Sequence, residues 1–252
     1  MRTKNSLLAA SFVAVAALLV GAAQDSAPPT IPTTPDGGGK FAGRQRRGDH
    51  PGRQGKEKGV EVGKVAPAFT LTGVDGKTYT LADFKGKTVI LEWFSPYCPV
   101  SAGGDNSYWG TGNASKVVTA VKAADPDAVY LTINSNKDDL DGKSTAQNGA
   151  DSTAAITKAG QSVPVLLDAA GTVGHAYGAR TTPHVFIVDA KGNIAYIGAP
   201  MSDDGKTDHI TNAVTALKAG KPVEPSTTKN KGCGIKYAPP SAKSETPPAP
   251  TT

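Results

Sequence analysis

Two cysteines, Cys98 and Cys233, are the residues of this 252-residue chain best suited to covalent chemistry. Cys98 follows residues 88–94, an apolar run that predicts a buried strand. A thiol at a strand end is activated when a helix begins there, because the free N–H groups and the dipole of the helix start favour the thiolate. We therefore predict that Cys98 is the reactive nucleophile, although the next run with helical spacing begins only near Ser115.

Other kinds of catalytic site leave no comparable pattern. No Ser-His-Asp arrangement, phosphate-binding loop or paired carboxylate site stands out. The chain has four histidines, but no second cysteine lies close to Cys98, so the sequence favours no metal site. We expect no bound organic cofactor either.

The first residues predict export. Arg2 and Lys4 precede the small, apolar and uncharged run 6–20, and small residues follow at 21–23. This apolar run is shorter than the ~20 residues that span a bilayer as a helix. We predict a signal peptide over residues 1–23 and a periplasmic or extracellular protein; an uncleaved N-terminal anchor is the alternative.

Residues 24–62 are predicted to be a disordered linker. Pro and Gly occur throughout, apolar periodicity is almost absent, and basic residues exceed acidic ones towards its end. The plain interpretation is a solvated spacer, and the alternative is weak contact with an anionic surface. Nucleic acid is not an expected partner, because the protein is predicted to be exported and this arm lacks interleaved aromatics.

Residues 63–223 have the length of one domain. Strands alternate with helices, which predicts an α/β fold with a central mixed β-sheet flanked by helices and with disordered ends. The expected elements, in chain order, are a hairpin over 69–71 and 78–81, a strand over 88–94, a helix over 115–124, a strand over 128–133, a helix within 151–159, a strand over 163–167, a helix over 172–177, a hairpin over 184–189 and 194–198, and a final helix over 208–219.

The predicted tail, residues 224–252, carries Cys233 between Gly232 and Gly234. Flanking glycines favour mobility. We expect Ile235 and Tyr237 to dock this tail in one redox state.

Three stretches resemble the redoxin, or alkyl hydroperoxide reductase and thiol-specific antioxidant, family. Residues 63–71 with 75–77 and 81–87 are similar to the opening of that family, and residues 181–189 resemble the cis-proline strand of thioredoxin-like proteins. Cys98 stands where the family keeps its reactive thiol. The resemblance implies a thioredoxin-like fold and a thiol-dependent oxidoreductase related to peroxiredoxins.

The resemblance also implies how Cys98 is resolved. Ser101 takes the place of the second cysteine of a thioredoxin Cys-x-x-Cys motif, so a partner sulfur must come from elsewhere. In peroxiredoxins a peroxidatic cysteine becomes a sulfenic acid and condenses with a distant resolving cysteine. Cys98 and Cys233 fit these two roles, while a permanent disulfide clamp and two independent thiols remain open.

Further residues of the implied site follow from the same comparison. Ser95 matches the Ser or Thr whose hydroxyl hydrogen-bonds the thiolate or peroxide, and Pro99 matches the proline after the peroxidatic cysteine. The family's earlier proline is Leu91 here, and its arginine falls at Pro183. Arg180 supplies the missing charge only if its loop bends inward.

Pro183 predicts a substrate groove. A cis proline removes a backbone donor and leaves a strand edge beside the thiol, where a peptide or mixed-disulfide partner can pair. Thr182 and His184 would line this groove with Pro183.

The function predicted from the sequence is peroxide reduction, an antioxidant activity, by an exported oxidoreductase with Cys98 resolved by Cys233. Thiol–disulfide exchange on exported proteins is the alternative, and a non-catalytic binding module with a structural disulfide is the alternative of another class. The expected partners are a peroxide or disulfide substrate and an external dithiol reductant resembling thioredoxin.

Overall fold

The computed structural model describes residues 59–239. The predicted signal peptide, most of the predicted linker and the end of the predicted tail lie outside these residues. No helix within residues 59–239 is long and apolar enough to cross a membrane.

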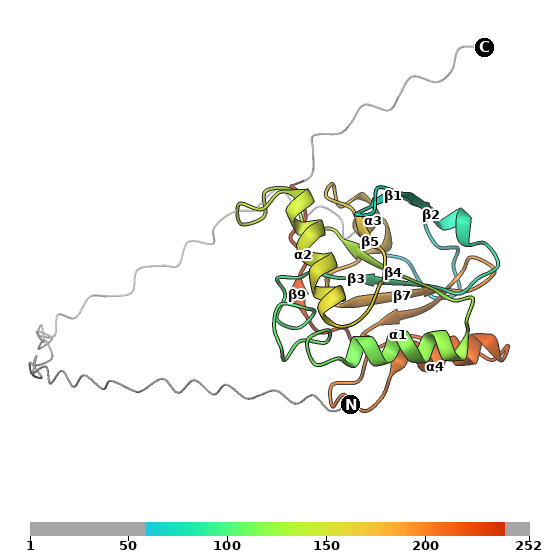
Figure 1. Cartoon of the computed structure of the whole chain (residues 1–252). Coiled ribbons are helices and arrows are strands. Elements are labelled where there is room, and N and C mark those ends of the chain that lie inside the picture. Colours follow the sequence, from blue (N-terminus) through green and yellow to red (C-terminus); the bar gives the residue numbers. More distant parts are fainter. Residues whose placement is uncertain (1–58, 240–252) are drawn as a thin grey trace, which may run out of the picture. The chain divides into compact units, whose positions relative to one another are not determined.

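A seven-stranded mixed sheet forms the centre of the described fold (Figure 1). Three neighbouring strands, β3, β4 and β5, are parallel, and the remaining pairs are antiparallel. The strand order across the sheet is β2 (Thr78–Thr80), β1 (Thr70–Gly73), β5 (Val165–Leu167), β4 (Val129–Asn134), β3 (Val89–Trp93), β7 (His184–Val188) and β8 (Ile194–Gly198). The predicted α/β fold with a mixed central sheet is confirmed.

Helices cover this sheet. They are η1 (Leu81–Phe84), α1 (Asn113–Ala124), α2 (Thr145–Lys158), α3 (Thr172–Tyr177) and α4 (His209–Lys218). Figure 1 shows α1 and α4 lying together along one face of the sheet. Helix α2 begins earlier than predicted, because Ser144 caps it by accepting a hydrogen bond from Gln147 N.

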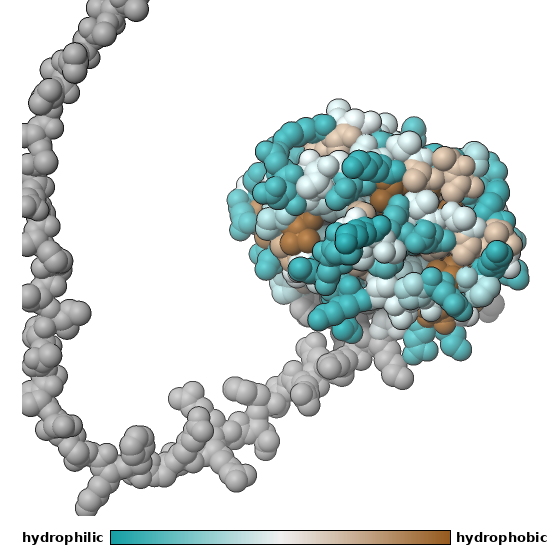
Figure 2. Space-filling view, turned by 90° about the horizontal axis from the view of Figure 1, so that it is seen from below, coloured by the Kyte–Doolittle hydropathy of each residue, from teal (hydrophilic) through white to brown (hydrophobic). Residues whose placement is uncertain are grey.

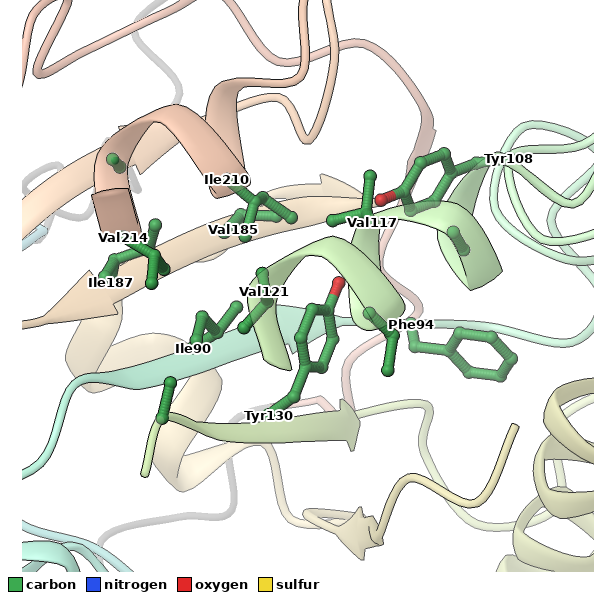
Figure 3. Packing of buried hydrophobic residues seen from close by; sticks show 14 of the residues in the cluster. Ile90, Phe94, Tyr108, Val117, Val121, Tyr130, Val185, Ile187, Ile210 and Val214 are labelled. Carbon is green, nitrogen blue, oxygen red and sulfur yellow. The ribbon is translucent and has the colours of Figure 1, made fainter. Parts of the chain in front are cut away.

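The two faces of β3 explain why this strand is apolar. Successive side chains of a strand point to opposite faces, so Ile90 packs in the layer under α1 and α4, whereas Leu91 and Trp93 pack in the layer that includes α3. Both layers are closed to solvent. The residues of the first layer that Figure 3 labels are Ile90, Phe94, Tyr108, Val117, Val121, Tyr130, Val185, Ile187, Ile210 and Val214.

Little apolar side-chain area is left on the described surface. The face in Figure 2 is mostly hydrophilic, with small separate apolar patches. Within residues 59–239, the large apolar side chains that are exposed belong to Val65, Val74 and Val100.

The part of the predicted tail that the structure describes packs on the domain. Strand β9 (Cys233–Gly234) pairs antiparallel with β6 (Thr181–Thr182), a two-stranded ribbon that the sequence analysis did not predict. Before this strand, Thr228 N donates to Ile197 O at 3.0 Å. These backbone hydrogen bonds hold the segment on the domain, so the expectation of a disordered C-terminal end does not apply to residues 224–239.

Candidate redox site

Cys98 lies in a tight turn just beyond β3. Its carbonyl accepts hydrogen bonds from the backbone N–H groups of Ser101, Ala102 and Gly103 at 3.0, 3.0 and 2.7 Å. The first regular helix after it, α1, begins only at Asn113. The thiol therefore stands at a turn rather than at the start of a long helix, and its acidity needs another source.

The Cys98 side chain is 3% exposed. Its Sγ donates to Thr182 O at 3.0 Å. The Thr182–Pro183 peptide bond is cis, as the family resemblance implies. Thr182 and Pro183 therefore lie beside the sulfur, where the predicted groove places them.

Cys233, which belongs to the tail, lies beside Thr182 and Cys98. In the β6–β9 pair, Cys233 is the direct partner of Thr182. Both cysteines are free thiols, with Cys98 buried and Cys233 half-buried. The Cys233 thiol hydrogen-bonds the Cys98 sulfur, and its own sulfur interacts with the backbone of Val100.

The two thiols differ in acidity. Burial opposes ionisation of Cys98, but hydrogen bonds from the Cys233 thiol, the Thr182 side chain and the backbone of Cys233 and Ser101 outweigh it and lower the Cys98 pKa. Burial, together with the Cys98 sulfur beside it, raises the pKa of Cys233. Cys98 is therefore the first of the two to become a thiolate, which is the form that attacks sulfur.

Several contacts fix the tail on both sides of Cys233. Asn230 Nδ2 donates to Thr181 Oγ1 at 2.6 Å, and Ile235 N donates to Arg180 O at 3.1 Å. Tyr237 donates its hydroxyl to Ala179 O at 2.9 Å and stacks on His175 with ring centroids 4.1 Å apart. The predicted docking of Ile235 and Tyr237 thus occurs with both cysteines in the thiol form.

A glycine permits the close approach of the tail. A Cβ on Gly232 would stand 2.1 Å from Thr182 O, which no side chain could tolerate. Gly232 therefore lets the chain come close enough for Cys233 to pair with Thr182.

Ser95 and Pro99 flank Cys98 in the chain without bonding its sulfur. The Ser95 hydroxyl accepts hydrogen bonds from Asn136 Nδ2 at 3.1 Å and Tyr97 N at 3.3 Å. Within the described residues it has no hydrogen bond to Cys98 Sγ; its backbone carbonyl accepts from Cys98 N at 3.4 Å instead. Pro99 is exposed beside the turn.

Arg180 and His184, which the sequence predicts at the groove, form no hydrogen bond with either cysteine among the described residues. Arg180 is exposed, and its backbone N–H donates to His184 Nδ1 at 3.3 Å. His184 is buried against Phe186. Burial, and then the charge of Arg180, lower the pKa of His184 to about 4, so this imidazole is neutral at pH 7.

Glu92 is a buried acid that the sequence analysis missed. Its two carboxylate oxygens accept from Trp109 Nε1 at 2.9 Å and from Tyr130 OH at 2.7 Å. Burial raises its pKa to about 7 despite these hydrogen bonds. Trp109 N also donates to Ser101 O at 2.9 Å, so Glu92 is linked through Trp109 to the turn that carries Cys98. A charged residue inside an otherwise apolar strand was the signal that could have revealed it.

Similar sequences come from thiol–disulfide oxidoreductases. The chain is 46% identical over 43 residues to the thiol-disulfide oxidoreductase ResA of Bacillus thuringiensis subsp. konkukian (strain 97-27), covering 17% of this chain and 25% of that protein. It is 24% identical over 138 residues to ResA of Geobacillus thermodenitrificans (strain NG80-2), covering 55% and 69%. The chain thus spans about a quarter of the length of the first of these relatives.

Two solved structures share the fold. A hypothetical protein from Sinorhizobium meliloti 1021 has a TM-score of 0.59 at 25% identity, covering 72% of this chain and 97% of that one. A conserved protein from Geobacillus kaustophilus has a TM-score of 0.59 at 27% identity, covering 72% and 94%. The Redoxin family model matches residues 61–217, and with this match the chain belongs to the Redoxin family.

Proposed function

We propose that the protein is a thiol–disulfide oxidoreductase whose redox centre is the pair Cys98 and Cys233. The observation that carries the proposal is the register of β6 and β9, in which Cys233 is paired with Thr182, the residue whose carbonyl accepts from Cys98 Sγ. The tail thereby supplies the second sulfur that Ser101 cannot.

The reaction begins at Cys98. Its thiolate attacks one sulfur of a substrate disulfide, the substrate S–S bond breaks, and one substrate thiol leaves with a proton from solvent. Cys233, once deprotonated, attacks the Cys98 sulfur of the mixed disulfide and releases the second substrate thiol. The protein is then oxidised, and an external thiol reductant returns it to the dithiol.

Cys98 is covered while the tail is docked, since only 3% of it is exposed. Attack on a disulfide therefore requires the segment around Cys233 to move away, and resolution requires it to return. The short β9 strand suits this movement, because only two residues form it.

Disulfide exchange has more support than peroxide reduction, the main prediction from the sequence. The relatives found by sequence are named thiol-disulfide oxidoreductases. The groups expected in a peroxide pocket are engaged elsewhere in the described structure: the Ser95 hydroxyl bonds Asn136 and Tyr97, and Arg180 is exposed.

Export is part of this proposal. It rests on the signal-peptide pattern of residues 1–23, and a reversible disulfide suits an oxidising compartment outside the cytoplasm.

Mass-spectrometric disulfide mapping tests the proposal. After treatment with a small disulfide such as glutathione disulfide, the wild-type protein should contain an intramolecular Cys98–Cys233 bond. Cys233→Ser should stop at a mixed disulfide on Cys98, because nothing else in the chain can resolve it. Stable adducts on both cysteines of the wild-type protein, with no internal bond, would contradict the proposal.

A further inference from the structure

A cavity of about 360 Å³ opens beside the cysteine pair. Its wall includes Pro99, Val100, Pro183 and Lys231. Val100 joins the cavity to the redox centre, because its backbone interacts with the Cys233 sulfur. This volume lies within the ~300–1,000 Å³ range of small-molecule sites.

The edge of strand β6, next to the cavity, cannot pair with another polypeptide while the tail is docked on it. Thr181 and Thr182 already pair with Cys233 and Gly234. A protein partner that needs this edge is therefore excluded from the closed form, whereas the cavity remains open beside it.

Neither cysteine lines this cavity, although Pro99 and Val100 follow Cys98 in the chain and Lys231 is two residues before Cys233. Of the two sulfurs, that of Cys233 is the more accessible to a molecule held there. Cys98 is buried, whereas Cys233 is half-buried. In the oxidised protein, attack on Cys233 would release Cys98 as a thiolate, which hydrogen bonds from the Thr182 side chain and the backbone of Ser101 stabilise.

The cavity also offers charges of both signs. Lys231 and Asp203 are exposed on its wall. Among the ion pairs between described residues, none involves either side chain. Both are thus available to a ligand that carries an ammonium and a carboxylate group.

We propose that this cavity binds the reductant of the oxidised enzyme and that the reductant is a low-molecular-weight thiol of the amino acid or short-peptide class. Its carboxylate pairs with Lys231, its ammonium pairs with Asp203, and its sulfur is directed at Cys233. The proposal rests on the Cys98–Cys233 disulfide of the proposed function and replaces the thioredoxin-like dithiol expected from the sequence.

The exchange balances in two steps. The thiol loses its proton to solvent and attacks Cys233 Sγ; the Cys98–Cys233 bond breaks, a mixed disulfide forms on Cys233, and Cys98 leaves as a thiolate. A second molecule of thiol attacks the mixed disulfide, forms the small disulfide and leaves Cys233 as a thiol. Two small thiols are oxidised and one protein disulfide is reduced.

Reduction kinetics of the oxidised full-length mature protein test this proposal. Rate constants for cysteine and for the uncharged 2-mercaptoethanol, each corrected to its thiolate concentration, are expressed as a ratio. This ratio should fall about fivefold in Lys231→Gln, and by the same factor in the separate variant Asp203→Asn. A fivefold loss is the largest effect expected from removing one exposed ion pair. The ratio should keep its wild-type value in Lys229→Gln, a control on an exposed lysine of the same tail outside the cavity.

Singly charged thiols separate the two contacts. Mercaptoacetate should respond to Lys231→Gln only, and cysteamine to Asp203→Asn only. A ratio unchanged in both variants, or changed equally in Lys229→Gln, would overturn the cavity proposal while leaving the enzyme's disulfide in place. Failure to find the Cys98–Cys233 bond in the starting protein would instead overturn the proposed function, and this proposal with it.

Discussion

Cys98 and Cys233 lie together but are held by different parts of the molecule. Cys98 follows a strand that is buried along its whole length, and backbone hydrogen bonds close the turn around it. Cys233 lies on a two-residue strand, fastened by a few contacts and by the ring of Tyr237. One sulfur is thus fixed by the core and the other by a detachable segment. A reversible redox pair needs this combination. The Cys98 sulfur must keep its position, whereas the segment that carries Cys233 must move away to admit a substrate and return to resolve the mixed disulfide.

The largest expected effect is on the fixed sulfur. Cys98→Ser should lower disulfide-exchange activity at least about a hundredfold, because a hydroxyl cannot take the place of the attacking thiolate. Cys233→Ser should retain the first attack. Turnover of a small disulfide by both variants, with trapped species identified by mass spectrometry, measures this difference. Equal first-step rates in the two variants would contradict the assignment of Cys98 as nucleophile.

Glu92 lies on β3, the buried strand that holds Cys98 in place. Its pKa is raised from 4.5 to about 7 in the folded protein, so the unfolded chain releases this proton at lower pH than the folded one. The free energy of unfolding should therefore fall by about 3 kcal/mol as pH rises from 4.5 through 7. Glu92→Gln, which resembles the protonated acid, should lack this fall.

Urea denaturation at several pH values measures this difference. Glu61→Gln, at an exposed position, serves as the control and should follow the wild-type pH dependence. A Glu92→Gln profile parallel to that of the wild-type protein would show that folding does not raise the pKa of Glu92, which contradicts the prediction.

Docking of the tail segment that carries Cys233 depends on Tyr237. Tyr237→Ala removes the hydrogen bond to Ala179 O and the stacking on His175. Losing about 1.4 kcal/mol of docking should slow intramolecular disulfide formation about tenfold. Stopped-flow quenching after a pulse of small disulfide gives this rate. Lys229→Ala, whose side chain is exposed on the same tail, should react at the wild-type rate; an equal loss there would remove the specific role of Tyr237.

A smaller expected effect is on the pKa values of the two thiols, because each cysteine shifts the pKa of the other. Cys233→Ala removes a hydrogen bond that stabilises the Cys98 thiolate, so the Cys98 pKa should rise. Cys98→Ala removes a neighbour that opposes ionisation of Cys233, so the Cys233 pKa should fall. The pH dependence of iodoacetamide labelling gives both values. Shifts of the same sign in both variants would be inconsistent with this mutual influence.

Features encoded in short stretches of sequence were predictable. The strand leading to Cys98 is one apolar run, and the hairpin that ends in β8 is marked by alternating residues and a Lys-Gly turn. The α3 helix was placed at its observed bounds, residues 172–177. The family resemblance also led to the cis Thr182–Pro183 bond.

The docking of the tail was only partly predictable. Ile235 and Tyr237 are apolar anchors in a polar segment, which gave a reason to expect docking. Strand β9 has two residues and exists because β6 offers it a partner, so no periodicity in the tail could reveal it. The acidity of Cys98 likewise depends mainly on Cys233 and Thr182, which are distant in sequence, rather than on the start of a helix.

The reduction potential of the Cys98–Cys233 disulfide tests the central claim most directly. A lowered Cys98 pKa stabilises the reduced form and raises the potential. Equilibration of the full-length mature protein with defined thiol and disulfide buffers, followed by mass-spectrometric quantification, gives this value. We expect a single intramolecular disulfide with a potential well above about −300 mV, the upper bound typical of structural disulfides. A potential below that bound would identify the bond as a static clamp and contradict a redox-active pair.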